Sequence, residues 1–253
     1  MKKIIIYLIL IVFVIAGILF FLSRVPAVQD ALFQRLAQTL ISTTPNVFPE
    51  EDSLSALVCG SKSPLPHPTR AETCVMIKAG DETFIFDVGN RSIDNLRNWR
   101  IPLDQLNAIF ISHLHSDHIA ELPEIHMWNW VGTGRQSKLK VYGPEGINQV
   151  LNGFTEAYSL DWKYRNDHHG DQFAPLKAAG FDGYEITDFS KPVYESNGIV
   201  ITAFLVDHKP IDPSLAFKIE YKGRSIVLSG DTVYSEAILN NSKNVDVLSL
   251  IHI

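Results

Sequence analysis

Three histidines and one aspartate follow a strongly apolar segment within six residues, and this cluster constrains the chain more than any other feature. Residues 109–118 read IFISHLHSDH, which predicts a buried strand that ends at the polar cluster. In an extended chain His113 and His115 point the same way, while Asp117 and His118 fall where a turn enters a helix. Imidazoles and a carboxylate that converge at one point suit Zn²⁺ or another first-row divalent ion. The cluster therefore predicts a metal site at the end of a strand.

Two later segments end in side chains of the same chemistry. Residues 204–208 (FLVDH) form an apolar run that ends at His208, and residues 225–232 (SIVLSGDT) lead to Asp231. Open α/β folds place their ligands where strand ends share one edge of a sheet. We therefore expect His208 and Asp231 to lie beside the first cluster.

Apolar periodicity and turn residues predict strands that come first in hairpins and then alternate with helices. This order is typical of a mixed α/β domain with helices packed on sheets. We expect one domain over residues 54–247, because no Gly/Ser- or Pro-rich linker divides them. Residues 160–182, rich in His, Asp, Gly and aromatic side chains, are expected to form a long loop or lid.

The amino terminus carries a long apolar run. Residues 4–22 contain no charged side chain, and a helix of that length at ~1.5 Å per residue spans a ~30 Å hydrocarbon core. Lys2 and Lys3 precede the run, so the positive-inside rule puts the amino terminus in the cytoplasm. We expect residues 1–22 to be a single-pass anchor in the inner or plasma membrane, residues 23–53 a connecting segment, and the domain extracytoplasmic. A cleavable signal peptide, giving a secreted domain, is the alternative.

Charge and cysteine content bear on partners and compartment. The chain has a net charge of −6, and residues 23–253 hold 20 basic and 28 acidic side chains, a net charge of −8. Because polyanion binding needs basic surface, we expect no nucleic-acid partner. Cys59 and Cys74 lie on two successive expected strands. They can form a disulfide outside the cytoplasm if those strands are neighbours, or remain two buried thiols.

Several of these motifs together resemble one family. HLHSDH followed by VDH and SGDT, with FDVG and VYGPEG around them, resembles the metallo-β-lactamase fold superfamily, and in particular its ribonuclease Z and arylsulfatase-like branch. The resemblance covers about residues 55–247. It implies an αββα four-layer sandwich that follows the amino-terminal transmembrane helix, with two divalent metal ions, Zn²⁺ by expectation, at the sheet edge.

The resemblance also implies the ligands of those two ions. One ion would be held by His113, His115 and His208; the other by Asp117 and His118, with Asp231 bridging both. Asp87 of the FDVG motif would support the site by hydrogen bonding rather than by coordination. Two such ions lower the pKa of a bridging water, and Asp117 and Asp231 could also orient that water or take its proton.

The sequence departs from the family pattern after the Gly-Asp strand, where family members carry one further metal-binding histidine. His252 lies too near Asp231 in the chain to fill that place. Residues 248–253 (LSLIHI) match the translation of a transposon-adapter end used in sequencing libraries. We therefore expect residues 248–253 to be a non-native tail and the carboxyl-terminal part of the sandwich to be incomplete.

The main functional expectation is a membrane-anchored hydrolase of small phosphate or sulfate esters that uses a metal-bridged hydroxide. The alternatives are a lactone or β-lactam hydrolase, a tRNA 3′-processing endonuclease, and a non-catalytic metal-binding protein. The net charge, the extracytoplasmic placement and the lack of room for an RNA-binding arm before residue 225 rank the endonuclease low. Among the other histidines, His126 is interpreted as structural, while His67 and the pair at 168–169 are weaker candidates for substrate contact.

Overall fold

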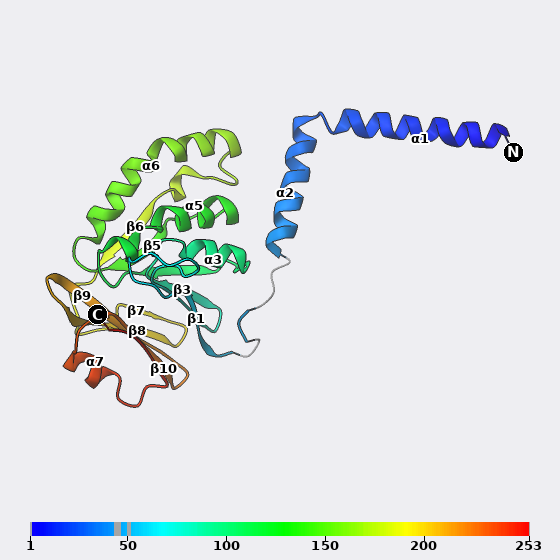
Figure 1. Cartoon of the computed structure of the whole chain (residues 1–253). Coiled ribbons are helices and arrows are strands. Elements are labelled where there is room, and N and C mark those ends of the chain that lie inside the picture. The colour runs from blue at the N-terminus through cyan, green and yellow to red at the C-terminus, as the bar shows by residue number, and fades with distance from the viewer. Residues whose placement is uncertain (1, 43–46, 50–51, 253) are drawn as a thin grey trace. The chain divides into compact units, whose positions relative to one another are not determined.

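The computed structural model describes residues 2–42, 47–49 and 52–252, in two units that divide after Pro45. The first unit consists of the helices α1 (Lys2–Leu22) and α2 (Pro26–Ser42) (Figure 1). Among the helical residues whose side chains are described, no single helix is long and apolar enough to span a membrane. One pair, Leu10–Leu22 with Pro26–Leu32, meets that test together but is bent by 90°. The transmembrane helix expected at residues 1–22 is thus not supported by these residues.

The second unit contains two sheets with helices outside them (Figure 1). The first sheet has the order β1-β2-β3-β4-β5-β6, with antiparallel pairing from β1 to β3 and parallel pairing from β3 to β6. Its strands are β1 (Leu54–Gly60), β2 (Cys74–Ala79), β3 (Glu82–Phe86), β4 (Leu106–Phe110), β5 (Leu139–Gly143) and β6 (Phe181–Glu185). Its outer face carries α3 (Ser92–Asn98), α5 (Leu122–Thr133) and α6 (Ile147–His169), while α4 (Ser116–Ile119) and the 3₁₀ turn η1 (Leu176–Ala178) lie in connections.

The second sheet has the order β11-β10-β9-β8-β7, antiparallel except for the parallel pair β10 and β11. Its strands are β7 (Tyr194–Ser196), β8 (Ile199–His208), β9 (Ile211–Tyr221), β10 (Arg224–Thr232) and β11 (Val247–His252). The short helix α7 (Glu236–Asn241) packs on the outer face, with Ile238 against Ala216 and Val227. Helices, two sheets and α7 make the four αββα layers that the sequence predicts.

Side-chain alternation along β3 builds the two cores on either side of the first sheet. Phe84 and Phe86 belong to the core between the sheets, whereas Ile85 belongs to the core under the helices. Every residue of this central strand is buried, as expected for a strand covered on both faces. In the core between the sheets, Phe86 stacks on Phe110 with ring centroids 4.9 Å apart. The core between the sheets holds the two sheets together, and the core under the helices holds α3, α5 and α6 on the first sheet.

The loop that the sequence predicts at residues 160–182 is shorter in the structure, because α6 continues to His169 and β6 begins at Phe181; residues 170–180, with η1, form the connection between them. Ion pairs one turn apart, Lys163 with Asp167 and Arg165 with Asp161, run along this part of the helix, and Trp162 is buried beneath it. The short strands β6 and β7 were also not predicted, since they are three to five residues long with weak apolar alternation.

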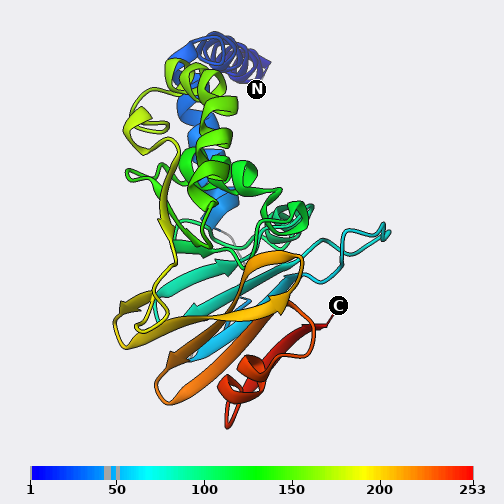
Figure 2. The same cartoon turned by 90° about the vertical axis from the view of Figure 1, so that its left-hand side faces the viewer.

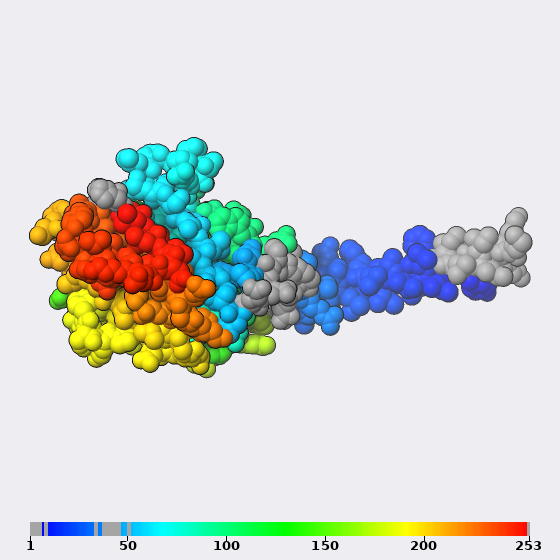
Figure 3. Space-filling model, turned by 90° about the horizontal axis from the view of Figure 1, so that it is seen from below, coloured from blue at the N-terminus to red at the C-terminus, as the bar shows by residue number. Residues whose placement is uncertain are grey.

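The carboxyl-terminal residues form the edge strand of the second sheet. β11 runs parallel to β10, with Ile251 opposite Asp231. In the space-filling view, α7 and β11 (red) lie over the orange and yellow strands of this sheet (Figure 3). The expectation that residues 248–253 are non-native stays a prediction, as do the domain boundaries, and residue 253 lies outside the described residues.

Cys59 and Cys74 form a disulfide with a Cα–Cα distance of 5.0 Å, which confirms one of the two readings of this pair. β1 and β2 are antiparallel neighbours, and the two cysteines lie where the strands meet the loop that joins them. Residues 61–72 of that loop project from the domain (cyan in Figure 2).

Candidate metal centre

The ends of three strands meet at one edge of the sandwich. His113 and His115 follow β4, His208 ends β8, and Asp231 lies near the end of β10. The two sheets are joined there by a hydrogen bond from the Leu215 amide to the Ser112 carbonyl at 2.9 Å. Polar residues far apart in the sequence therefore face one another, as the strand-end pattern predicts.

Gly230 permits this close approach. Its φ is +59°, and a Cβ at this position would lie 2.6 Å from the Leu215 carbonyl oxygen and 3.0 Å from Cβ of Ser112. Only glycine fits a left-handed backbone with neighbours this near. The glycine of the SGDT motif thus brings Asp231 against the end of β4.

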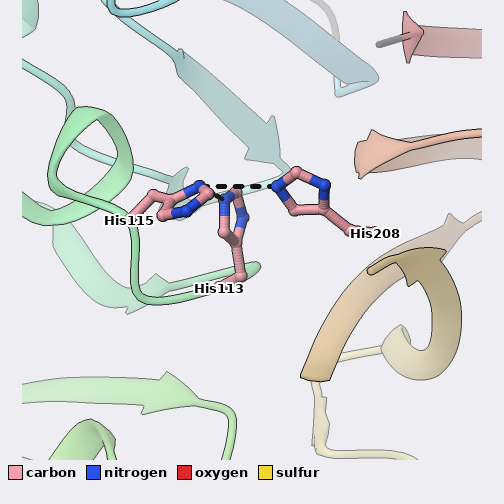
Figure 4. Close-up of side chains that lie close together, drawn as sticks. All are labelled: His113, His115 and His208. Atoms are coloured by element: carbon pink, nitrogen blue, oxygen red, sulfur yellow. Dashed lines mark hydrogen bonds between the residues drawn. The ribbon is translucent and has the colours of Figure 1, made fainter. Parts of the chain in front are cut away.

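Two groups of side chains could each hold a metal ion, and within each group the ligand atoms lie within 4.8 Å of one another. The first group is His113, His115 and His208, whose rings face one another (Figure 4). Nε2 of His113 lies 2.9 Å and Nε2 of His208 3.4 Å from Nδ1 of His115. The second group is His113, His118 and Asp231.

Three buried atoms at this edge have no hydrogen-bond partner among the described residues: Nε2 of His118, Nδ1 of His208 and Oδ1 of Asp231. Buried polar atoms without partners are rare in native proteins and call for an explanation. Nε2 of His118 lies 3.4 Å from Oδ1 of Asp231 and 3.7 Å from Oδ2 of Asp117. Imidazole nitrogens and carboxylate oxygens gathered this closely fit a divalent ion such as Zn²⁺.

Asp87 orients the site from behind, as the sequence analysis predicts. Its Oδ1 accepts the amide N–H of Ser112 at 2.8 Å, and its Oδ2 accepts the Ser112 hydroxyl at 2.8 Å. The same Oδ2 lies 2.9 Å from Nδ1 of His118. A carboxylate on Nδ1 fixes the proton there and leaves Nε2 for a metal.

Burial and the charges of neighbouring groups shift the pKa values of the histidines in this site. Burial lowers the pKa of His118, but the carboxylates of Asp87 and Asp231 outweigh it and raise the pKa to about 10. Burial and the neighbouring His118 lower the pKa of His113 to about 3. Burial also lowers the pKa of His208. Because metal ligation needs a neutral imidazole, an ion bound through Nε2 of His118 would displace a proton from that ring.

The structure brings all six predicted site residues to this edge, five of them buried and His115 exposed: His113, His115, Asp117, His118, His208 and Asp231. His126 lies away from them in an aromatic cluster, where its Nε2 accepts the Gly180 amide at 2.8 Å, so its structural interpretation is confirmed. Nδ1 of His67 accepts two amide N–H groups of its own loop. Residues 168 and 169 end α6.

Sequence reasoning missed Ser112. Its hydroxyl lies 2.8 Å from Oδ2 of Asp87, 3.1 Å from Nδ1 of His113 and 3.2 Å from Nδ1 of His118. A serine between a buried strand and the first histidine was the available signal, because a hydroxyl at that point must be buried with a polar partner.

A two-sheet sandwich whose joined edge gathers histidines and aspartates defines a metal-binding hydrolase fold. A family model, the metallo-beta-lactamase superfamily, matches residues 67–252. The chain belongs to the metallo-β-lactamase superfamily, within its ribonuclease Z branch.

Curated relatives support that branch. The ribonuclease Z of Mycobacterium marinum is 34% identical over 69% of this chain and 61% of its own length. That of Mycobacterium bovis is 32% identical over 77% of this chain and 69% of its own length. The chain thus spans about three-fifths to two-thirds of these relatives. The crystal structure of human tRNase Z, short form, shares the fold with a TM-score of 0.56 at 21% identity, covering 76% of each chain.

These relatives correct one expectation. From the net charge of −8 we expected no nucleic-acid partner, yet the matched relatives are named ribonuclease Z and a structural neighbour tRNase Z. The error comes from using the net charge, which is a sum over all charged side chains. Net charge averages the whole surface, whereas a polyanion meets only the charges beside the site.

Proposed function

We propose that this chain is a metal-dependent phosphodiesterase that cleaves RNA. One observation carries the proposal: the six side chains converge at the sandwich edge in a chain 32–34% identical to proteins named ribonuclease Z. Our main expectation from the sequence was a hydrolase of small phosphate or sulfate esters. The relatives favour the alternative expectation, an endonuclease that acts on RNA.

Divalent ions bound here would supply a hydroxide near neutral pH and polarise the phosphoryl oxygens. The residues of the chain do the rest. Asp117 and Asp231 orient the attacking water and accept its proton, as carboxylates beside a reacting group can do. Asp87 and Ser112 hold the imidazole of His118 in one orientation.

The loop beside the site offers local positive charge. Residues 61–70 contain no acidic residue; of their two cations, Lys62 is paired with Glu72 and Arg70 is the other. Nη1 of Arg91 reaches the Pro68 carbonyl of this loop at 3.4 Å. Arg91 lies two residues after Gly89, whose turn packs against Asp117, and Arg70 lies in the loop that Arg91 reaches. We propose that they contact backbone phosphates of the RNA.

The test is cleavage of a precursor tRNA with a 3′ trailer by the Zn²⁺-loaded full chain, beside an aryl phosphodiester as the small substrate. We expect the RNA to be cleaved, and His115→Ala to lose more than about 100-fold in kcat/KM, the upper end of what losing an outer-shell partner costs. His168→Ala, an exposed histidine at the end of α6, is the matched control and should keep full activity. Cleavage of the aryl diester alone would refute the RNA substrate.

We propose further that residues 4–22 anchor the chain in a membrane with the domain outside the cytoplasm, so that the RNA it cleaves would lie in that compartment and precursor tRNA stands in for it in the assay. Their freedom from charge supports this, and the Cys59–Cys74 disulfide suits an oxidising compartment. Alkaline carbonate extraction of membranes tests it: the full chain should stay in the pellet, and a chain without residues 1–22 should not. Release of the full chain into the supernatant would contradict anchoring.

A further inference from the structure

The disulfide closes the base of the loop of residues 61–72, which projects from the domain (cyan in Figures 2 and 3). Cys59 and Cys74 are 1% and 0% exposed, so the cross-link lies inside the core under the helices. Within the loop base, the amides of Ser61 and Lys62 both donate to the Ala71 carbonyl at 2.9 Å. The cross-link and these bonds hold the two ends of the loop together.

The loop base in turn holds the turn that follows β3. The Thr73 carbonyl, next to Cys74, accepts the Gly89 amide at 3.0 Å. Glu72 and Asn90 exchange two bonds: the Glu72 amide donates to the Asn90 carbonyl at 3.0 Å, and the Asn90 amide donates to Oε2 of Glu72 at 2.9 Å. Oε1 of Glu72 pairs with Lys62 at 2.6 Å. The buried carboxylate therefore ties the loop base to residues 89–90.

The same turn carries the metal-site residues. Asp87 begins it, and the Val88 amide donates to the His118 carbonyl at 2.8 Å. A Cβ on Gly89 would lie 2.1 Å from the Asp117 carbonyl oxygen and 2.4 Å from Cβ of Glu72. The turn is thus packed between the loop base on one side and the segment of Asp117 and His118 on the other.

We propose that the Cys59–Cys74 disulfide and Glu72 are positioning groups for the metal centre. By holding the turn at residues 87–90, they keep Asp87, Asp117 and His118 in the arrangement that binds a divalent ion. Loss of either group lets the turn move and weakens metal binding, because outer supports set how well ligands are oriented. This inference concerns metal affinity and does not depend on RNA being the substrate.

The test compares Zn²⁺ affinity and local hydrogen exchange in full-length variants. In Cys59→Ala/Cys74→Ala we expect Zn²⁺ binding, measured by competition with a chelator, to weaken about tenfold. Amide exchange of residues 87–90 should rise in the same variant. Glu82→Ala is the matched control, since Glu82 lies at the opposite end of β3 from Asp87 and accepts bonds from Tyr194, Ser196 and Asn197. It should lower the Tm but leave Zn²⁺ affinity unchanged.

Unchanged Zn²⁺ affinity in the folded double variant would overturn the proposal. An equal loss of affinity in Glu82→Ala would overturn it as well, because the effect would then be general destabilisation. If the double variant does not fold, the pair Glu72→Ala and Glu72→Gln decides with the disulfide intact. We expect Glu72→Ala to bind Zn²⁺ about tenfold more weakly and Glu72→Gln, which keeps an oxygen for the Asn90 amide, to recover most of the affinity. Wild-type affinity in Glu72→Ala refutes the role of Glu72.

Discussion

Asp87 shows how much a single buried residue contributes to the centre. Its φ is +59°, a left-handed conformation that aspartate tolerates better than most residues. This turn directs both carboxylate oxygens at Ser112 and one of them at His118. The FDVG motif thus places an acceptor directly behind the metal ligands.

Asp87→Asn should weaken Zn²⁺ binding by about 10- to 100-fold, because the amide nitrogen cannot accept the proton on Nδ1 of His118. Chelator competition measures the affinity. Asp182→Asn is the control, since Asp182 on β6 bonds the exposed Tyr184 hydroxyl. Equal Zn²⁺ affinity in the two variants would refute the role of Asp87 in supporting the metal site.

At the scale of elements, His126 joins α5 to the start of β6. Its ring lies 4.7 Å from Trp162 and 5.0 Å from Phe181, centroid to centroid. Burial lowers its pKa to about 4; a backbone bond to Ala178 opposes this shift and the charge of Arg135 adds to it. The imidazole is therefore neutral in the folded chain at neutral pH and protonates much more readily after unfolding.

This difference makes stability depend on pH. Between the unfolded pKa of 6.5 and the folded value of about 4, the unfolded chain binds the extra proton. The free energy of unfolding therefore falls as the pH falls, by about 2 kcal/mol from this group between pH 7.5 and pH 5. Urea unfolding at both pH values should show a loss smaller by that amount in His126→Gln. Parallel losses in the two proteins would contradict the assignment.

At the scale of the whole molecule, the sequence was most informative where polar residues end apolar strands. His113 follows such a strand, His208 and Asp231 lie at the ends of two others, and the shared sheet edge brings them together. Ser112 and Glu72 could not be identified from the sequence, because Ser112 contacts Asp87 and Glu72 contacts Asn90, and both partners are distant in the chain. The first half of α6 was predicted as a helix over residues 146–157, but residues 160–169 were not, because their polar composition suggested a loop, whereas ion pairs and buried Trp162 stabilise a helix. The expectation of no nucleic-acid partner was wrong because a net charge does not tell where on the surface the charged side chains lie.

We predict that hydrolysis requires a metal ion held at this edge, which is tested by removing the metal and then restoring it. The full chain is stripped with a chelator, assayed on the precursor tRNA and the aryl diester, then reassayed after Zn²⁺ is restored. We predict that cleavage disappears and returns in the wild type, and that it stays absent in His208→Ala at the same Zn²⁺ concentration. Undiminished cleavage by the stripped chain, or full activity in His208→Ala, would contradict the account.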